Sequence, residues 1–215
     1  MPVEVKICGL STPETVEAAI AAGADLVGFV FFPKSPRNVS LEQAAKLAWL
    51  ARGKARIVAL TVDAGDALLS AINAAVDPDL FQAHGAETPK RIAAIVQLTG
   101  KPVIKAIRVR DDADIAAAGD FSSVASLILY DAKAPETLSN ALPGGNGHAF
   151  DWTLLDGERR PAFMLAGGLT PVNVAEAIRA TGAPMVDVSS GVESSPGIKD
   201  VALIRKFIEA AKRSG

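Results

Sequence analysis

The chain has 215 residues, of which 49% are hydrophobic and 21% charged, and its formal net charge at pH 7 is −2. This composition is typical of a globular protein and excludes a disordered or fibrous one. The nearly balanced charge, with no cluster of lysine and arginine, argues against nucleic acid, so we expect small molecules as partners. The apolar run at residues 26–32 falls far short of the roughly 20 residues that span a bilayer, and we expect no membrane span.

Cys8 is the only cysteine, so no intramolecular disulfide can form. The first residues, MPVEVKICG, lack the charged region and long apolar stretch of a secretory leader. Both observations favour the reducing cytoplasm as the location of the protein.

Short apolar runs recur along the chain with helical segments between them, which is the pattern of βαβ units in a parallel sheet. Most runs are apolar throughout, as expected for strands covered on both faces. Eight units in this length give roughly 27 residues each, close to the lower limit for an eightfold barrel. We therefore predict a single-domain (β/α)8 TIM barrel over residues 1–215, with a doubly wound open sheet as the alternative. The expected strands are residues 3–8, 26–31, 56–62, 80–83, 102–107, 127–130, 162–166 and 185–188.

The segments between these strands carry helix-start signals. Ser11 with Glu14 three residues later predicts a capping box, and Ser40 with Gln43 repeats the pattern. Asp63 is expected to cap the helix that begins near residue 66.

Seven segments are more distinctive than the general pattern, and they fall in order over nearly the whole chain: KICGL at 6–10, GFVFFPKSPR at 28–37, FQAHG at 81–85, GGNGHAFDW at 144–152, LAGGL at 165–169, VDVSSGVE at 186–193 and PGIKD at 196–200. Together they resemble the phosphoribosylanthranilate isomerase family, small barrel enzymes of tryptophan biosynthesis. Two segments depart from the family pattern, TVDA at 61–64 and YDA at 130–132. Neither removes a functional residue.

The resemblance implies a cofactor-independent aldose–ketose isomerase. Its reaction is the Amadori rearrangement of N-(5-phosphoribosyl)anthranilate to 1-(2-carboxyphenylamino)-1-deoxyribulose 5-phosphate by general acid–base catalysis. The expected partner is this sugar phosphate, and the expected assembly is a monomer or a homodimer.

Two residues at strand ends are the candidate catalytic groups, since the loops after the strands form the open face of a barrel. A lone cysteine such as Cys8 is often only a buried structural residue, but at this rim it can ionise if nearby groups lower its pKa. Asp131 could be only a helix cap. As an acid it must hold a proton at working pH, which its apolar neighbours at 128–130 favour. The resemblance implies that Cys8 is the general base and Asp131 the general acid.

Three more residues are candidate substrate ligands. Arg37 lies in a loop stiffened by prolines, where arginine is usually solvated, but an inward guanidinium would suit a carboxylate. The resemblance implies that it holds the carboxylate of the anthranilate ring. His84 follows the fourth strand and could contact substrate, and Asp187 could bond the sugar hydroxyls.

Glycines follow the last two strands, where barrels often bind phosphate at the start of a short extra helix. Gly167 and Gly168 also suit a tight turn with positive φ, which is compatible with phosphate binding. The second loop contributes Ser189, Ser190 and Gly191. The glycine-rich stretch at 144–147 is expected to be a lid.

We predict no metal site, because His84, His148, Cys8 and Asp151 have no recognised ligand spacing. Two alternative functions are kept. One is the related isomerase of histidine biosynthesis, which would need a second anion site and an aspartate in place of Cys8. The other is a sugar-phosphate-binding barrel without turnover.

Overall fold

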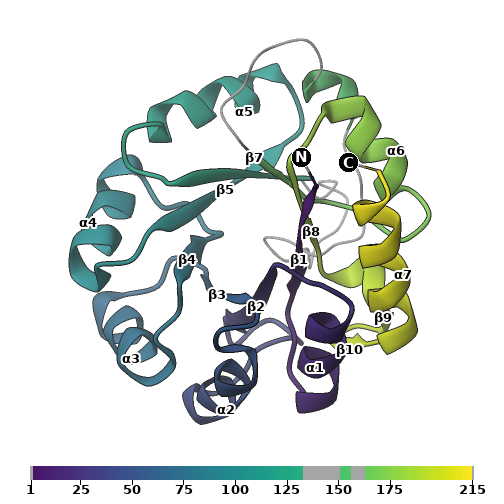
Figure 1. Cartoon of the computed structure of the whole chain (residues 1–215). Coiled ribbons are helices and arrows are strands. Elements are labelled where there is room, and N and C mark those ends of the chain that lie inside the picture. The colour runs from purple at the N-terminus through teal and green to yellow at the C-terminus, as the bar shows by residue number, and fades with distance from the viewer. Residues whose placement is uncertain (1, 133–150, 156–162, 215) are drawn as a thin grey trace.

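The computed structural model describes residues 2–132, 151–155 and 163–214. Its strands pair in parallel and in chain order, and β1 also pairs with β8, which closes the sheet into a barrel. Figure 1 shows the ring of strands with helices around it. The prediction of a TIM barrel is confirmed, and the closing pair excludes an open sheet. The barrel strands are β1 (Glu4–Cys8), β2 (Leu26–Phe31), β3 (Arg56–Thr61), β4 (Leu80–Ala83), β5 (Val103–Val109), β6 (Leu127–Ala132), β7 (Phe163–Leu165) and β8 (Met185–Val188).

The helices lie outside the strands (Figure 1), and none in the described part of the chain is long and apolar enough to cross a membrane. A short antiparallel hairpin of β9 (Glu193–Ser195) and β10 (Ile198–Lys199), absent from the sequence prediction, follows β8. The helices are α1 (Pro13–Ala21), α2 (Leu41–Ala51), α3 (Asp66–Val76), α4 (Pro89–Thr99), α5 (Asp112–Ala116), α6 (Val174–Thr181) and α7 (Val201–Lys212), with the 3-10 turns η1 (Ala117–Phe121), η2 (Trp152–Leu155) and η3 (Ser190–Val192).

The predicted strand limits agree with the structure to within two residues at each described end. The second, fourth and eighth strands match residue for residue. The sixth continues two residues further than expected, because its pairing with β5 runs on through Asp131 and Ala132. Asp131 is therefore held inside a strand. Residue 162, the expected start of the seventh strand, lies outside the described residues.

One of the three predicted helix caps is correct. Ser40 caps α2, and its hydroxyl oxygen accepts a hydrogen bond from the Gln43 amide. The prediction for Ser11 is wrong by one residue, since Thr12 is the N-cap of α1. The prediction for Asp63 is wrong as well. Its carboxylate accepts from the Ala86 amide across to the next loop, and α3 starts without a side-chain cap.

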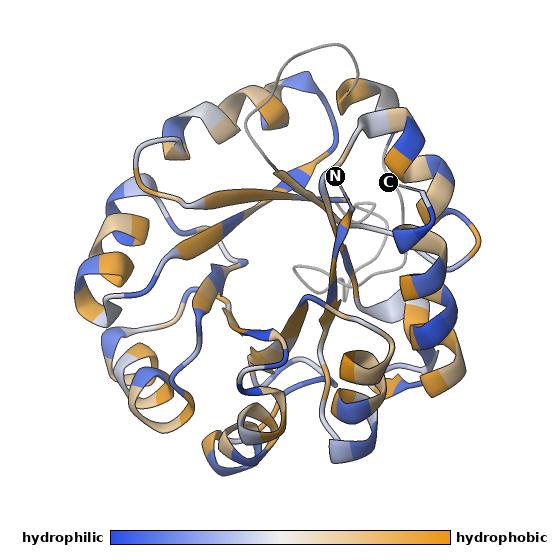
Figure 2. Ribbon diagram, viewed as in Figure 1, coloured by the Kyte–Doolittle hydropathy of each residue, from blue (hydrophilic) through white to orange (hydrophobic). Residues whose placement is uncertain are grey.

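Successive side chains of each strand point alternately out of the barrel and into it, which gives two apolar layers. Figure 2 shows the strands predominantly hydrophobic. One face of each strand packs outward against the helices. The other faces the barrel interior, where an apolar layer fills the amino-terminal half: Leu26, Val58, Leu80, Ile104, Leu129 and Met164. Nearer the carboxyl ends the interior holds buried polar groups instead. The packed half at the amino-terminal ends of the strands thus supports the half at their carboxyl ends, where charged side chains meet.

Candidate active site

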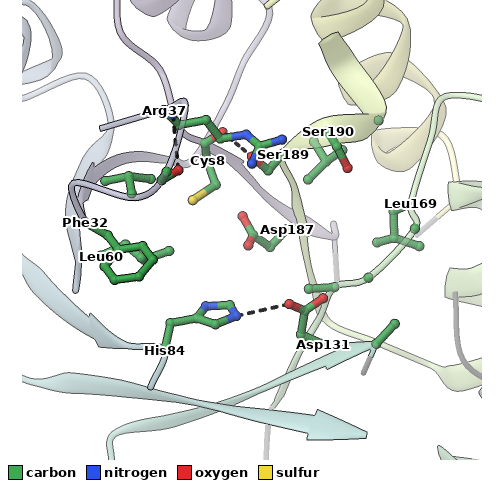
Figure 3. A pocket seen from close by; sticks show the side chains of 18 of the residues that line it. Cys8, Phe32, Arg37, Leu60, His84, Asp131, Leu169, Asp187, Ser189 and Ser190 are labelled. Carbon is green, nitrogen blue, oxygen red and sulfur yellow. Dashed lines mark hydrogen bonds and ion pairs between the residues drawn. The ribbon is translucent and has the colours of Figure 1, made fainter. Parts of the chain in front are cut away.

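One pocket opens at the carboxyl ends of the barrel strands, and the candidate residues from the sequence meet in it (Figure 3). Apolar side chains of Val30, Phe32, Leu60 and Val62 form the wall over β2 and β3. All ten candidates line the pocket: Cys8, Arg37, His84, Asp131, Gly167, Gly168, Asp187, Ser189, Ser190 and Gly191.

Cys8 is the last residue of β1, and its free thiol is buried, with 3% of the residue exposed. Gly9 follows with a φ of 76°, a conformation that glycine adopts without strain. A Cβ built at Gly9 would lie 2.7 Å from Cδ of Arg37. The glycine after the thiol therefore lets the Arg37 stem pass beside the end of β1.

The thiol of Cys8 lies in a mixed electrostatic environment. Burial raises its pKa, the positive charge of Lys6 lowers it, Asp187 raises it, and Lys199 lowers it. The net direction is upward, because the desolvation of the thiolate outweighs the two lysines. The expected lowering of this pKa is thus wrong as a net result, although cations that act in that direction are present.

Lys6 is a member of this site that the sequence prediction missed. It is completely buried, and its Nζ donates to Oδ1 of Asp187 at 2.9 Å. Burial lowers the pKa of Lys6, but Asp187 and Cys8 outweigh it, and the pKa is raised. The signal was available in the sequence, since a lysine inside an apolar strand is seldom buried without a partner. Asp187, predicted as a sugar ligand, carries this ion pair and also lines the pocket.

Arg37 is buried, and its guanidinium already binds one carboxylate of the protein. Nε and Nη2 donate to the two oxygens of Glu193 at 2.7 and 2.8 Å. Lys199 donates to the same carboxylate at 2.7 Å and to the Ser189 carbonyl at 2.8 Å. The hairpin after β8 thereby fixes the loop arginine at the pocket rim, a long-range contact that no local pattern indicates.

Arg37, Glu193 and Lys199 form a cluster at the pocket rim. Their contacts shift the pKa values of Glu193 and Lys199. Burial raises the pKa of Glu193, but the hydrogen bond from Arg37 and the charge of Lys199 outweigh it, so the pKa is lowered. Burial lowers the pKa of Lys199 to about 8, against the opposing effect of Glu193. The carboxylate is therefore charged near neutral pH, and it offsets part of the cost of burying its two cations.

Asp131 and His84 face the pocket from the opposite wall (Figure 3), with 3.1 Å between Oδ2 of Asp131 and Nε2 of His84. The side-chain nitrogen of Gln82 lies 2.9 Å from Nδ1 of His84. An amide nitrogen only donates, so Nδ1 is the acceptor and Nε2–H donates to Asp131. Oδ2 of Asp131 is thus engaged by the imidazole. Gln82 is a second residue that the sequence prediction missed.

Glycines bring the loops after β7 and β8 into close contact. Gly167 and Gly168 have φ values of 85° and 63°. A Cβ at Gly167 would collide with the Ala132 backbone nitrogen, and one at Gly191 would overlap the Leu169 carbonyl oxygen. Gly191 lies in η3, a short helical turn where the sequence led us to expect one. Two backbone segments can therefore approach the same ligand.

Ser189 connects these loops to the end of β1. Its hydroxyl donates to the Cys8 carbonyl at 3.1 Å and accepts from Lys199 at 3.2 Å. The side chain predicted to contact phosphate thus fastens the loop to the end of β1. Ser190 lines the pocket beside it.

In the described ranges no group of three or more histidine, cysteine, aspartate or glutamate side chains could hold a metal ion. His148 and the glycine-rich stretch at 144–147, predicted as a lid, lie outside those ranges.

Comparison with known proteins gives a consistent result. The isomerase of Rhodopseudomonas palustris strain BisA53 is 56% identical over 213 residues, 99% of this chain and 97% of its own. That of Parvibaculum lavamentivorans is 53% identical over the full length of both chains. Both are named N-(5'-phosphoribosyl)anthranilate isomerase.

Two crystal structures of phosphoribosyl anthranilate isomerases support the same relationship. The Thermotoga maritima structure superposes with a TM-score of 0.87 at 35% identity, covering 98% of this chain and 99% of its own. A second, in complex with reduced 1-(o-carboxyphenylamino)-1-deoxyribulose 5-phosphate, gives 0.84 at 33% identity with the same coverage. The model of the N-(5'-phosphoribosyl)anthranilate (PRA) isomerase family matches residues 5–210, and the chain belongs to this family.

Proposed function

We propose that the chain isomerises N-(5'-phosphoribosyl)anthranilate to 1-(2-carboxyphenylamino)-1-deoxyribulose 5-phosphate. The observation that carries the proposal is the placement of Cys8 and Asp131 on opposite walls of one pocket (Figure 3), beside two glycine loops. An acid and a base on either side of a sugar are the minimum machinery for an aldose–ketose isomerisation.

Asp131 acts first, as the general acid. Its Oδ1 gives a proton to the ring oxygen, the C1–O bond breaks, and the nitrogen lone pair forms a C1=N double bond. The sugar is then an open-chain protonated Schiff base. Nε2–H of His84 donates to the other carboxyl oxygen, so it holds Asp131 in one orientation and stabilises the carboxylate that remains.

Cys8 then acts as the general base. Its thiolate takes the proton from C2, the C–H electrons form a C1=C2 double bond, and the C=N electrons return to nitrogen. The resulting enolamine tautomerises to the ketone, with a proton added at C1 and one lost from the C2 hydroxyl. The positive charge on the Schiff base makes the C2 proton acidic enough for a thiolate to remove.

The apolar wall and Arg37 suit the anthranilate end of the substrate. Val30, Phe32 and Leu60 offer a surface for the aromatic ring, and the guanidinium beside them offers charge to its carboxylate. Asp187 would accept from the sugar hydroxyls with the oxygen that Lys6 does not occupy.

The glycine loops suit the phosphate end. Backbone N–H groups of the loops after β7 and β8 would bind an anion without needing a charged side chain. Gly168 and Gly191 are the positions where the phosphate would approach the backbone most closely.

The protein is proposed to act in the cytoplasm, since a free thiol that must ionise suits a reducing compartment. The proposed assembly is a monomer or a homodimer, and light scattering on the purified protein distinguishes them.

The test is turnover by the purified protein, followed as loss of the substrate's anthranilate fluorescence. We expect activity without added metal or cofactor. Absence of activity at every enzyme concentration would overturn the proposal. Thermal-shift measurements with sugar phosphates would then tell a binding protein from an unrelated one.

A further inference from the structure

The interior of the barrel holds a charged pair directly beside the proposed base. Lys6 and Cys8 are two residues apart on β1, so their side chains share the interior face of the strand. Lys6 is in register with Asp187 on β8, and Cys8 with Gly28 on β2. The pairing of the strands thus places Asp187 beside Lys6 and a glycine, without a side chain, beside Cys8.

Gly28 accounts for the close approach of the lysine stem and the thiol. A Cβ built at Gly28 would lie 3.1 Å from Sγ of Cys8 and 3.2 Å from Cε of Lys6. Both groups therefore border the space that this glycine leaves empty. A side chain at this position would crowd both groups.

We propose that Lys6 is a positioning residue for the isomerisation: its buried ammonium group, held by Asp187 at 2.9 Å, stabilises the thiolate form of Cys8. Removing a buried charge from water is costly unless an opposite charge lies next to it. Lys6 supplies that charge from inside the protein, before substrate enters. The inference rests on the proposed function of Cys8 as the base.

Other charged groups around the thiol act more weakly or at a greater distance. Asp187 opposes Lys6, and Lys199 of β10 assists it. Arg37 and Glu193 neutralise one another at the rim, and His84 and Asp131 are paired on the far wall. Burial has the largest effect on the pKa of Cys8. Among the charged groups that act on this pKa, Lys6 has the largest effect.

The single cysteine permits a direct test that needs no turnover. Alkylation by iodoacetamide, measured by mass spectrometry over a range of pH, reports the ionisation of Cys8 alone, because only the thiolate reacts. Lys6→Met should move the midpoint to higher pH and slow alkylation at pH 8 by roughly tenfold for each unit of the shift. Asp187→Asn should move the midpoint the opposite way, to lower pH.

Lys6→Met leaves Asp187 buried without its partner and can fail to fold. The double variant Lys6→Met/Asp187→Asn removes both charges and keeps the core neutral. Lys6 acts on the thiol more strongly than Asp187 does. The alkylation midpoint of Cys8 in the double variant should therefore still lie at a higher pH than in the unmodified protein. An unchanged or lower midpoint in the double variant would overturn the inference.

Lys105 provides a matched control. It is also a buried lysine in a buried ion pair, 2.8 Å from Glu87, but it lies on β5, and the ring of Phe121 in η1 packs 5.8 Å away. Lys105→Met/Glu87→Gln should destabilise the fold to a similar degree without moving the Cys8 midpoint. An equal shift in this control would assign the effect to general loosening of the barrel and contradict the inference.

Failure of this inference and failure of the proposed function give different results. If the midpoints shift as expected but the unmodified protein has no turnover, Lys6 controls the thiol and the proposed function is wrong. If turnover is present and the midpoints do not respond to Lys6, only the inference is wrong. In the active protein, the limb of the kcat/KM pH profile that belongs to the base should move with the alkylation midpoint.

Discussion

The two walls of the pocket differ in how they treat charge. On the wall of β1, β8 and the following hairpin, Cys8 lies among formal charges, namely the Lys6–Asp187 pair and the cluster of Arg37, Glu193 and Lys199. On the wall of β4 and β6, Asp131 has an imidazole as its partner, and that ring is held by an uncharged amide.

The difference agrees with what each proposed catalytic group must do. A base must lose its proton inside a buried site, so neighbouring cations help it. An acid must keep its proton until substrate arrives, and a cation beside it would favour ionisation. The buried lysine nearest the acid wall, Lys105, is directed to Glu87 and to the Gly85 carbonyl instead. Cys8 thus has cations near it that favour its thiolate, whereas the partner of Asp131 is the imidazole of His84.

The largest expected effect is the loss of the base. Cys8→Ser keeps the shape of the side chain but cannot ionise near neutral pH, so turnover should fall by roughly two to four decades. The variant should retain the circular dichroism spectrum of the folded protein and its affinity for product. Turnover that survives the substitution would make Cys8 a core residue and remove the contrast between the walls.

Loss of the acid should reduce turnover by a similar factor to loss of the base. It should leave the wall that carries Cys8 unaffected. Asp131→Asn cannot give a proton to the ring oxygen, and kcat should fall by roughly two decades or more. The alkylation midpoint of Cys8 should stay where it is in the unmodified protein. A shift of that midpoint would show that the two walls are electrostatically coupled.

The rim arginine should have an intermediate effect. Arg37→Ala should cost about 2 kcal/mol or more in kcat/KM, because a buried charge is removed and Glu193 keeps Lys199 as its one cationic partner in the described residues. Arg37→Lys should recover little, since an ammonium cannot bind Glu193 with two parallel hydrogen bonds. Steady-state kinetics on both variants test this, and full activity in both would leave Arg37 without a role in binding.

The phosphate end should respond in KM more than in kcat, because phosphate binding is shared by the ground state and the transition state. In Gly191→Ala the new Cβ meets the Leu169 carbonyl, and the loops after β7 and β8 must move apart. We expect KM to rise roughly tenfold, the equivalent of one hydrogen bond to a charged group. An unchanged KM would contradict the phosphate assignment.

The smallest effect concerns acid stability. Glu193 and Glu87 are buried, which raises their pKa values, but hydrogen bonds from Arg37 and Lys105 outweigh this and lower them. A carboxylate with a lowered pKa in the folded state contributes stability above its unfolded value, about 4.3, and that stability is lost as the pH falls through the folded pKa. Urea denaturation should show the free energy of unfolding decreasing from about pH 4.5 downward. Glu193→Gln and Glu87→Gln should each flatten this slope.

The sequence alone determined the strands, their order and the residues at their carboxyl ends. Apolar runs and helix signals are local, and a barrel has one open face, so Cys8, His84 and Gly191 could be assigned to it from position. Asp131 was assigned correctly to this rim even though its strand proved two residues longer.

Only the tertiary structure decided which partners these residues meet. Lys6 and Asp187 are 181 positions apart, and Arg37 and Glu193 are 156 apart. A pair of this kind depends on which strands close the barrel and in which register, and that is set by packing of the whole chain. A single lysine or glutamate carries no local signal of its partner. The chain thus encodes the position of its proposed catalytic groups locally, and only the closed barrel decides which charged groups surround them.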